Sequence, residues 1–412
     1  MPSKRPGARE QRLSSITAPN RRALIAGAAA VAAMPFTRCI FSPAIAQAGP
    51  IKVGVLSPLS GVFSGSGMHL VNGIKMAFDE MDNKIAGRPV TLAVEDDEAK
   101  PQEGLRKARK LVESDQVDIL LGVISSAVGY AIKEYVSRAQ KVWLVGAAGA
   151  DGIFRKKNNN PYAYRSSLSV WQANSPMGTW LAAKGYKRVL YTGPDYAMGR
   201  EAIDAFRSTF RVPNAETVGE IFVPLGTNDF APYVAQMKKA QPDLVYASYA
   251  GSDAVRFVQQ FSEFGLAQSI KLAGFGYLVT EDVLAVQKEA AVGINSGINW
   301  AYGLDTPANR QFVENYRRRY NTSATEDSVA GYVCAQVTAD AITSLGGNIR
   351  NQLELSAAVA KVKLMSPRGP ISFDPATNNV IQNIYIREVR KDGNEFHNYV
   401  VATYENVKDP GE

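Results

Sequence analysis

Residues 51–82, IKVGVLSPLSGVFSGSGMHLVNGIKMAFDEMD, predict a strand, a loop and a helix in succession. The β-branched apolar run 51–56 is typical of a buried parallel strand, and it stops at Ser57-Pro58 because proline donates no hydrogen bond to a ladder. A loop rich in glycine and serine follows over 57–67. Apolar residues then recur at helical spacing, at Leu70, Ile74, Phe78 and Met81. Such a unit opens an α/β domain, in which ligands bind beyond the carboxyl ends of the strands.

The alternation of strands and helices continues beyond residue 82 and occurs in two similar series. The second series begins near residue 169, and the chain after Trp300 becomes mainly helical before it ends in two strands around a polar turn at 390–393. This order predicts an α/β protein with two doubly wound parallel-sheet lobes. The predicted strands are 51–56, 89–95, 117–122, 142–145, 188–191, 217–223, 243–248, 270–274, 383–389 and 398–403.

Positive charge is concentrated at the N-terminus of the 412-residue chain, whose formal net charge is +7. Residues 1–48 hold seven basic side chains against the single acid Glu10, a net of +6, which leaves only +1 for all the other residues. The basicity therefore belongs to a leader. The remainder offers no electrostatic footprint for a nucleic-acid partner.

This leader has the three parts of a signal peptide: a basic segment that ends in Arg21-Arg22, an Ala- and Gly-rich apolar run over 23–33, and an A-x-A site at Ala46-Gln47-Ala48. We expect cleavage after Ala48 and a periplasmic mature protein. The arginine pair and the weakly hydrophobic run favour twin-arginine export, and a Sec signal with a chance arginine pair is the alternative. The run is too short for a membrane anchor.

Few residues of the mature chain suit catalysis or metal binding. It has two histidines, His69 and His397, and neither is near a nucleophile elbow or a metal-ligand partner. The glycines of the 57–67 loop lack G-x-G-x-x-G spacing, so a dinucleotide-dependent enzyme is only the enzymatic alternative. We expect no enzyme activity, no metal and no cofactor. Cys334 alone remains after cleavage, which excludes an internal disulfide.

Several motifs occur in a fixed order along the mature chain. They are I-x-x-G-x-L-x-P-L-S-G at 51–61, Asp195-Tyr196 with Gly199, Gly331-Tyr332, and Gly369-Pro370 followed by Phe373-Asp374. Behind an export signal, this order resembles the periplasmic solute-binding proteins of ABC importers, of the branched-chain amino acid (leucine/isoleucine/valine) type. The resemblance covers the whole mature chain.

The resemblance implies two lobes joined by a hinge of three crossovers, near 165–169, 296–300 and 367–375, with the ligand in the cleft. The expected first lobe comprises 49–168 and 298–370. The second comprises 169–297 and 371–405, and 406–412 form a tail. In this family the lobes close over a solute, and we expect this chain, as a monomer, to deliver its solute to an ABC-type permease in the inner membrane. A periplasmic ligand sensor has the same fold and is the alternative.

Ligand-binding residues are also implied by the resemblance. The carboxylate-binding serine of the family corresponds to Ser125 or Ser126, the second carboxylate contact to Ala148 and Gly149, and the tyrosine over the ligand side chain to Tyr196. Free amides and hydroxyls at a helix start suit a carboxylate, although either serine could instead be an ordinary N-cap. Aromatic residues at strand exits and crossovers could wall an apolar pocket: Tyr130, Trp171, Tyr196, Tyr249, Phe275, Tyr277 and Trp300.

Two positions depart from the amino-acid binders of this family. Where those proteins hold the ligand ammonium with acids, this chain has Ser169 and Gly276-Tyr277. A buried ammonium without a counter-charge is costly, so a standard α-amino acid is disfavoured. We expect a small carboxylate- or amide-bearing solute, amino-acid-like or aromatic. Three other acids could reach the pocket and restore an amino-acid ligand: Asp195, Asp253 and Glu281.

Overall fold

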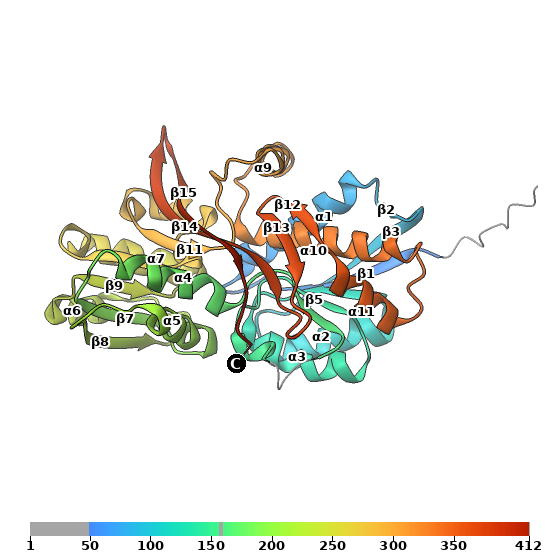
Figure 1. The fold of residues 1–412 in the computed structure, drawn as a ribbon, viewed down its shortest axis with the longest axis horizontal. Coiled ribbons are helices and arrows are strands. Elements are labelled where there is room, and N and C mark those ends of the chain that lie inside the picture. Colours follow the sequence, from blue (N-terminus) through green and yellow to red (C-terminus); the bar gives the residue numbers. More distant parts are fainter. Residues whose placement is uncertain (1–48, 156–159, 412) are drawn as a thin grey trace, which may run out of the picture. The chain divides into compact units, whose positions relative to one another are not determined.

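The computed structural model describes residues 49–155 and 160–411 (Figure 1). Residues 1–48, with the predicted signal peptide, the arginine pair and the cleavage site, lie outside the described residues. The described strands form two separate sheets. Apolar clusters cover both faces of each sheet, so the predicted α/β class with two doubly wound lobes is confirmed.

The first sheet has six strands in the described part of the chain, and all but the short edge strand β2 run parallel. Its order is β2 (Lys84–Ile85), β3 (Arg88–Asp96), β1 (Ile51–Ser57), β4 (Ile119–Gly122), β5 (Trp143–Val145) and β6 (Ala163–Arg165). Its helices are α1 (Ser64–Glu80), α2 (Pro101–Arg109), α3 (Ser126–Arg138), α9 (Pro307–Tyr320), α10 (Glu326–Ser344) and α11 (Gln352–Lys361).

Side chains of the first sheet alternate between two cores. Ile119 and Leu121 of β4 pack with α1, α9, α10 and α11, whereas Leu120 packs with α2 and α3 on the other face. Successive side chains of a strand point to opposite faces, so both faces of a strand covered by helices must be apolar. The late helices, which have no sheet of their own, thus complete the first lobe.

The first helix begins earlier than its apolar spacing indicates. α1 starts at Ser64, inside the predicted 57–67 loop. The cause is the close approach of the helix start to the strand exit: a Cβ at Gly67 would lie 1.7 Å from the carbonyl oxygen of Pro58. The glycines of this stretch therefore permit backbone packing as well as an open loop.

Glycine also permits α1 and α10 to cross closely. A Cβ at Gly331 would lie 2.0 Å from the carbonyl oxygen of Leu70, and one at Gly73 would lie 1.9 Å from that of Ser328. A glycine of each helix thus packs directly against the backbone of the other helix. The Gly331 motif of the sequence is therefore a packing feature.

The second sheet has nine strands in the described part of the chain. The parallel strands are β8 (Glu216–Val223), β7 (Arg188–Pro194), β9 (Leu244–Ala247), β10 (Lys271–Phe275) and β11 (Asn295–Ile298), and the antiparallel ones are β12 (Leu364–Ser366), β13 (Gly369–Phe373), β14 (Val380–Asp392) and β15 (Glu395–Val407). One face packs on α4 (Val170–Ala182) and α5 (Ala197–Thr209), and the other on α6 (Ala231–Ala240), α7 (Gly251–Glu263) and α8 (Glu281–Gln287).

Strand β14 connects the cores of the two lobes. Val380 at its start packs in the first core, and Ile386 and Val389 pack in the cores of the second sheet. Near the same place, Arg165 at the end of β6 forms a parallel bridge with Asn379. The chain therefore passes between the lobes at neighbouring points, while the division at residues 168, 297 and 370 stays a prediction.

Strands β14 and β15 form a longer hairpin than predicted (Figure 1). The pairing extends to Asp392 and Glu395, so the turn is Gly393-Asn394 rather than 390–393. Gly393 has a φ of 58°, which glycine adopts without strain in a two-residue turn. Among the described residues, no helix is long and apolar enough to cross a membrane.

Candidate functional site

The two predicted serines at the start of α3 have different roles. The Ser126 hydroxyl accepts a hydrogen bond from the Ala150 N–H at 3.1 Å and so ties α3 to the loop after β5. Ser125 is the N-cap residue, but its side chain makes no capping hydrogen bond. Of the two serines, Ser125 is therefore the one whose hydroxyl has no partner among the described residues and can bind a solute. It lies beside the amides of the first helical turn, which have no partner within the helix.

Ala148 and Gly149 lie in the loop that Ser126 holds. The Ala148 N–H donates to the carbonyl of Val123 at 3.2 Å, so it is already used. The carbonyl of Gly149 accepts from Val170 N–H at 2.8 Å, but the Gly149 N–H has no partner among the described residues. The Ser125 hydroxyl and the Gly149 amide thus lie on two segments that the Ala150–Ser126 hydrogen bond joins. Two donors of this kind suit a carboxylate.

Ser169 has a structural partner. Its hydroxyl accepts from Gln172 N–H at 3.1 Å, and the Gln172 side chain accepts from Ser169 N–H at 3.0 Å, which is a capping box at the start of α4. Ser169 is fully buried. The S-x-x-Q spacing in the sequence was the signal for this role.

Tyr196 and Tyr277 are brought together in one apolar cluster. Tyr277 packs edge-on against Phe275, with ring centroids 5.1 Å apart, and Tyr196 packs partly exposed against the same cluster. Leu168 and Val170 of the cluster also lie 3.5 and 3.2 Å from the position of a Cβ on Gly149. The aliphatic side chains of Leu168 and Val170 therefore adjoin Gly149, and they belong to the same cluster as Tyr196 and Tyr277.

Tyr249 lies in the core of the second lobe. It is 1% exposed, its hydroxyl is 2.6 Å from the Thr192 hydroxyl, and its ring packs on Phe230 and Phe257 at 5.2 and 4.6 Å. The structure does not bring it together with Tyr196 and Tyr277. Its position directly after a strand gave no signal of the direction in which its side chain points.

The three acids that could have reached the pocket each have a partner in the second lobe. Asp195 pairs with Arg200 at 2.6 Å. Asp253 accepts from Gly226 N–H at 2.8 Å, and Glu281 accepts from the Asn398 side chain at 3.0 Å.

Asp327, at the start of α10, is a site residue that the sequence did not indicate. Its carboxylate accepts from the Tyr277 hydroxyl at 3.4 Å, across the two lobes, and from the Ser66 hydroxyl. Burial, with the nearby Asp282 carboxylate, raises the pKa of Asp327 to about 7. Acids are common in the first turn of any helix, so its position carried no specific signal.

A cavity of about 230 Å³ is lined in part by Ser66 and Asp282, the neighbours of Asp327. One side belongs to the first loop and α1, and the other to the starts of α7 and α8; its lining is Gly61, Val62, Ser64, Gly65, Ser66, Gly251, Ser252, Val255, Asp282 and Val283. None of the eight predicted site residues lines it. The first loop does, as expected for a loop beyond the carboxyl end of a strand.

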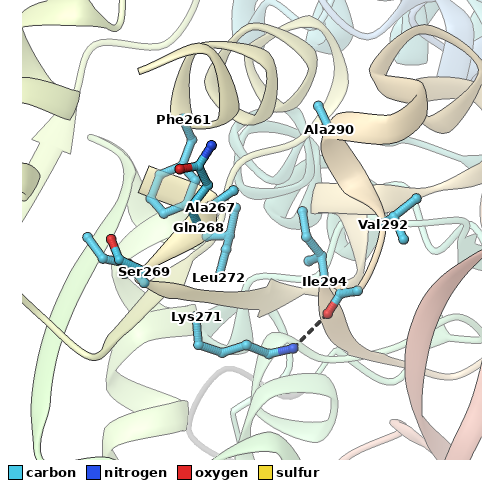
Figure 2. Close-up of a pocket in the computed structure, with 11 residues that line it drawn as sticks. Phe261, Ala267, Gln268, Ser269, Lys271, Leu272, Ala290, Val292 and Ile294 are labelled. Atoms are coloured by element: carbon cyan, nitrogen blue, oxygen red, sulfur yellow. Dashed lines mark hydrogen bonds between the residues drawn. The ribbon is translucent and has the colours of Figure 1, made fainter. Parts of the chain in front are cut away.

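A second hollow, of about 370 Å³, opens at the amino end of β10 (Figure 2). Figure 2 shows Lys271 in its wall, where the ammonium donates to the carbonyl of Gly293 at 2.6 Å. Because ligands of α/β sheets bind at the carboxyl ends of strands, this hollow is a poor candidate for the solute site.

Comparisons with known proteins agree with this architecture. The family model "Periplasmic binding protein" matches residues 50–394. Leu/Ile/Val-binding protein homolog 6 of Brucella melitensis biotype 1 is 32% identical over 372 residues, which are 89% of this chain and 94% of that protein.

Two solved structures are similar over 88% of this chain and 99% of their own. One is a solute binding protein of an ABC transporter from Rhodopseudomonas palustris BisB5 in complex with 3,4-dihydroxybenzoic acid, with 32% identity and a TM-score of 0.84. The other, from R. palustris in complex with benzoate, has 28% identity and a TM-score of 0.83.

The family match spans most of the chain, and the match to the Brucella relative covers nearly the whole length of that protein. The expected resemblance, the fold class and the exclusion of an enzyme are confirmed. Family membership also implies an extracytoplasmic location. This chain therefore belongs to the periplasmic binding protein family and is a solute-binding protein of the ABC transporter type, not an enzyme.

Proposed function

We propose that this protein captures a small aromatic carboxylate of the benzoate class in the periplasm and delivers it to an ABC-type permease. The observation that carries the proposal is a set of two donors without a partner among the described residues, the Ser125 hydroxyl and the Gly149 N–H, together with the nearby apolar cluster that contains Tyr196 and Tyr277. Donors at a helix start satisfy a carboxylate, and an aromatic cluster suits a planar ring. The benzoates bound by similar proteins support this solute class.

A branched-chain amino acid is the second candidate. Asp282 lines the cavity near the buried Asp327, and these acids offer a counter-charge for an ammonium; the Brucella relative is named a Leu/Ile/Val-binding protein homolog. Burial and the mutual repulsion of these two acids raise the pKa of Asp327, which weakens it as a counter-charge at neutral pH. The benzoate class is therefore preferred.

A thermal-shift screen tests the solute class. At about 100 times its Kd, a solute that binds only the folded state stabilises it by about 2.7 kcal/mol, which raises the melting temperature measurably. We expect benzoate, 4-hydroxybenzoate and 3,4-dihydroxybenzoate to do so, and leucine and valine to leave it unchanged. A shift with leucine or valine but not with the aromatic acids would establish the second candidate instead.

The two serines of α3 should respond differently to replacement by alanine. Ser125→Ala removes a solute contact and no cap, so we expect about 10-fold weaker binding of 4-hydroxybenzoate and an unchanged melting temperature. Ser126→Ala leaves the buried Ala150 N–H unpaired, at a cost of about 1–3 kcal/mol in unfolding free energy. Calorimetry and thermal melts of both variants measure this, and equal effects of the two variants on both quantities would contradict the assignment.

We also propose that export uses the twin-arginine route, on the basis of Arg21-Arg22 and the weakly hydrophobic run after them. Replacement of both arginines by lysine should keep the precursor in the cytoplasm, as detected by cell fractionation and blotting. N-terminal sequencing of the exported wild-type protein should begin at Gly49. Normal export of the lysine variant would indicate the Sec route.

Transport rather than sensing is the proposed role, since the similar solved proteins are described as solute binding proteins of ABC transporters. Deletion of the gene should abolish uptake of labelled 4-hydroxybenzoate at low concentration. Unchanged uptake together with a lost transcriptional response to the solute would point to a sensor.

A further inference from the structure

A carboxylate of the second lobe is bound by two segments of the first. Glu201, on α5, accepts a hydrogen bond from Asp151 N–H at 2.6 Å and a further one from the Gly152 backbone. Its other oxygen lies 3.4 Å from the Tyr130 hydroxyl, which donates to it. Asp151 and Gly152 open a short 3₁₀ turn, and Tyr130 lies on α3.

These two segments are the ones that carry the proposed carboxylate donors. Tyr130 follows the N-cap Ser125 on the same helix, and Asp151 follows Gly149 in the same loop. Glu201, on the second lobe, is therefore hydrogen-bonded to both segments of the first lobe that carry the proposed donors. Its own carboxylate is turned to the backbone of the loop, so it is occupied by the protein and is not a solute contact.

Charged groups of both signs surround Glu201 at the lobe interface. Arg165 is fully buried, donates to the carbonyl of Ala150 at 2.5 Å, and attracts the carboxylates of Asp151, Glu201 and Asp409. Burial raises the pKa of Glu201, and the Asp151 amide and Arg165 oppose that shift by favouring its charged form. A charged acceptor makes stronger hydrogen bonds than a neutral one.

We propose that Glu201 is a positioning residue that fastens the second lobe to the donor-bearing segments and so retains the solute in the closed cleft. The proposal rests on the proposed function. Hydrogen bonds between lobes exist only while the lobes are together, so they add to the stability of the closed state alone. Since Glu201 does not touch the solute, it should set how long a solute stays, and not which solute is preferred.

The test compares Glu201→Ala with wild type, using 4-hydroxybenzoate and benzoate as probes. We expect dissociation about 10-fold faster for both probes by stopped flow, with an unchanged ratio of their affinities. Small-angle scattering at saturating 4-hydroxybenzoate should show less compaction. Glu201→Gln, which keeps one acceptor oxygen, should fall between the two. Asp204→Ala, on the exposed side of the same helix, is the matched control and should behave as wild type.

Unchanged dissociation in Glu201→Ala would overturn the proposal, and a changed affinity ratio would make Glu201 a solute contact instead. If Glu201→Ala does not fold, Tyr130→Phe removes only one donor to the same carboxylate and should give a smaller acceleration in the same direction. If wild type binds neither aromatic acid, the proposed function fails. The Glu201 inference is then judged with leucine as the probe, by the same dissociation and scattering measurements.

Discussion

Replacement of Arg387 by methionine is expected to lower the free energy of unfolding by about 3–5 kcal/mol. The guanidinium is fully buried and donates to the Ser296 hydroxyl at 3.2 Å, the Trp300 carbonyl at 3.0 Å and the Gly276 carbonyl at 2.9 Å. Methionine has a similar length but no donor. Three buried acceptors would lose their partner at the point where β14, β11 and the exit of β10 meet.

Electrostatics adds to this loss. Arg387 attracts the buried carboxylates of Glu281 and Glu326. Both oxygens of Glu326 lack a hydrogen-bond partner among the described residues, and burial raises the pKa of this carboxyl to about 8. Removal of Arg387 takes from Glu281 its main neighbouring positive charge and leaves Glu326 with Arg368 alone, so both buried carboxyls lose part of their electrostatic compensation.

Urea denaturation followed by circular dichroism, without solute, measures the effect. Arg390→Met is the matched control, because Arg390 lies on the same strand with about half of its side chain exposed, pairs with the partly exposed Glu388 and lies over the Tyr399 ring. It should change the unfolding free energy by less than about 0.5 kcal/mol. Equal destabilisation by the two substitutions would show that the buried network contributes nothing.

The second large effect is expected for Gly331→Ala, at about 3 kcal/mol of destabilisation. The new Cβ would lie 2.0 Å from the carbonyl oxygen of Leu70 and 2.9 Å from its carbon. Both atoms are backbone, so α1 and α10 must move apart. The loss of close packing between the helices outweighs the gain of about 1 kcal/mol that alanine brings over glycine in an isolated helix.

Thermal melts of Gly331→Ala and of Asp340→Ala separate these two contributions. Asp340 is on the exposed side of α10, where alanine improves helix propensity without a contact. We therefore expect a lower melting temperature for the first variant and an equal or slightly higher one for the second. A Gly331→Ala protein as stable as wild type would mean that the helices can separate without cost.

Local patterns were sufficient for the fold class and for ten of the described strands, but not for β2, β6, β11, β12 and β13. Strand 51–56, the helical spacing after it and the repeated strand–helix order follow from the period of apolar residues, and that period records burial directly. The capping box of Ser169 and Gln172 also has a local signal, the S-x-x-Q spacing within one helical turn, although Ser169 was predicted as a position near the solute. The small residues that follow the strands predicted where the ligand cleft lies, because the carboxyl ends of parallel strands meet at one edge of a sheet.

Only the tertiary structure decided which side chains share a site. Ser125 and Ser126 are neighbours, and the bond from Ala150 alone distinguishes the structural serine from the free one. Tyr249 and Tyr277 both follow strands, yet one packs in a lobe core and the other donates to Asp327. The physical reason is that these choices depend on partners far away in the chain, because a buried polar group is costly unless such a partner is present.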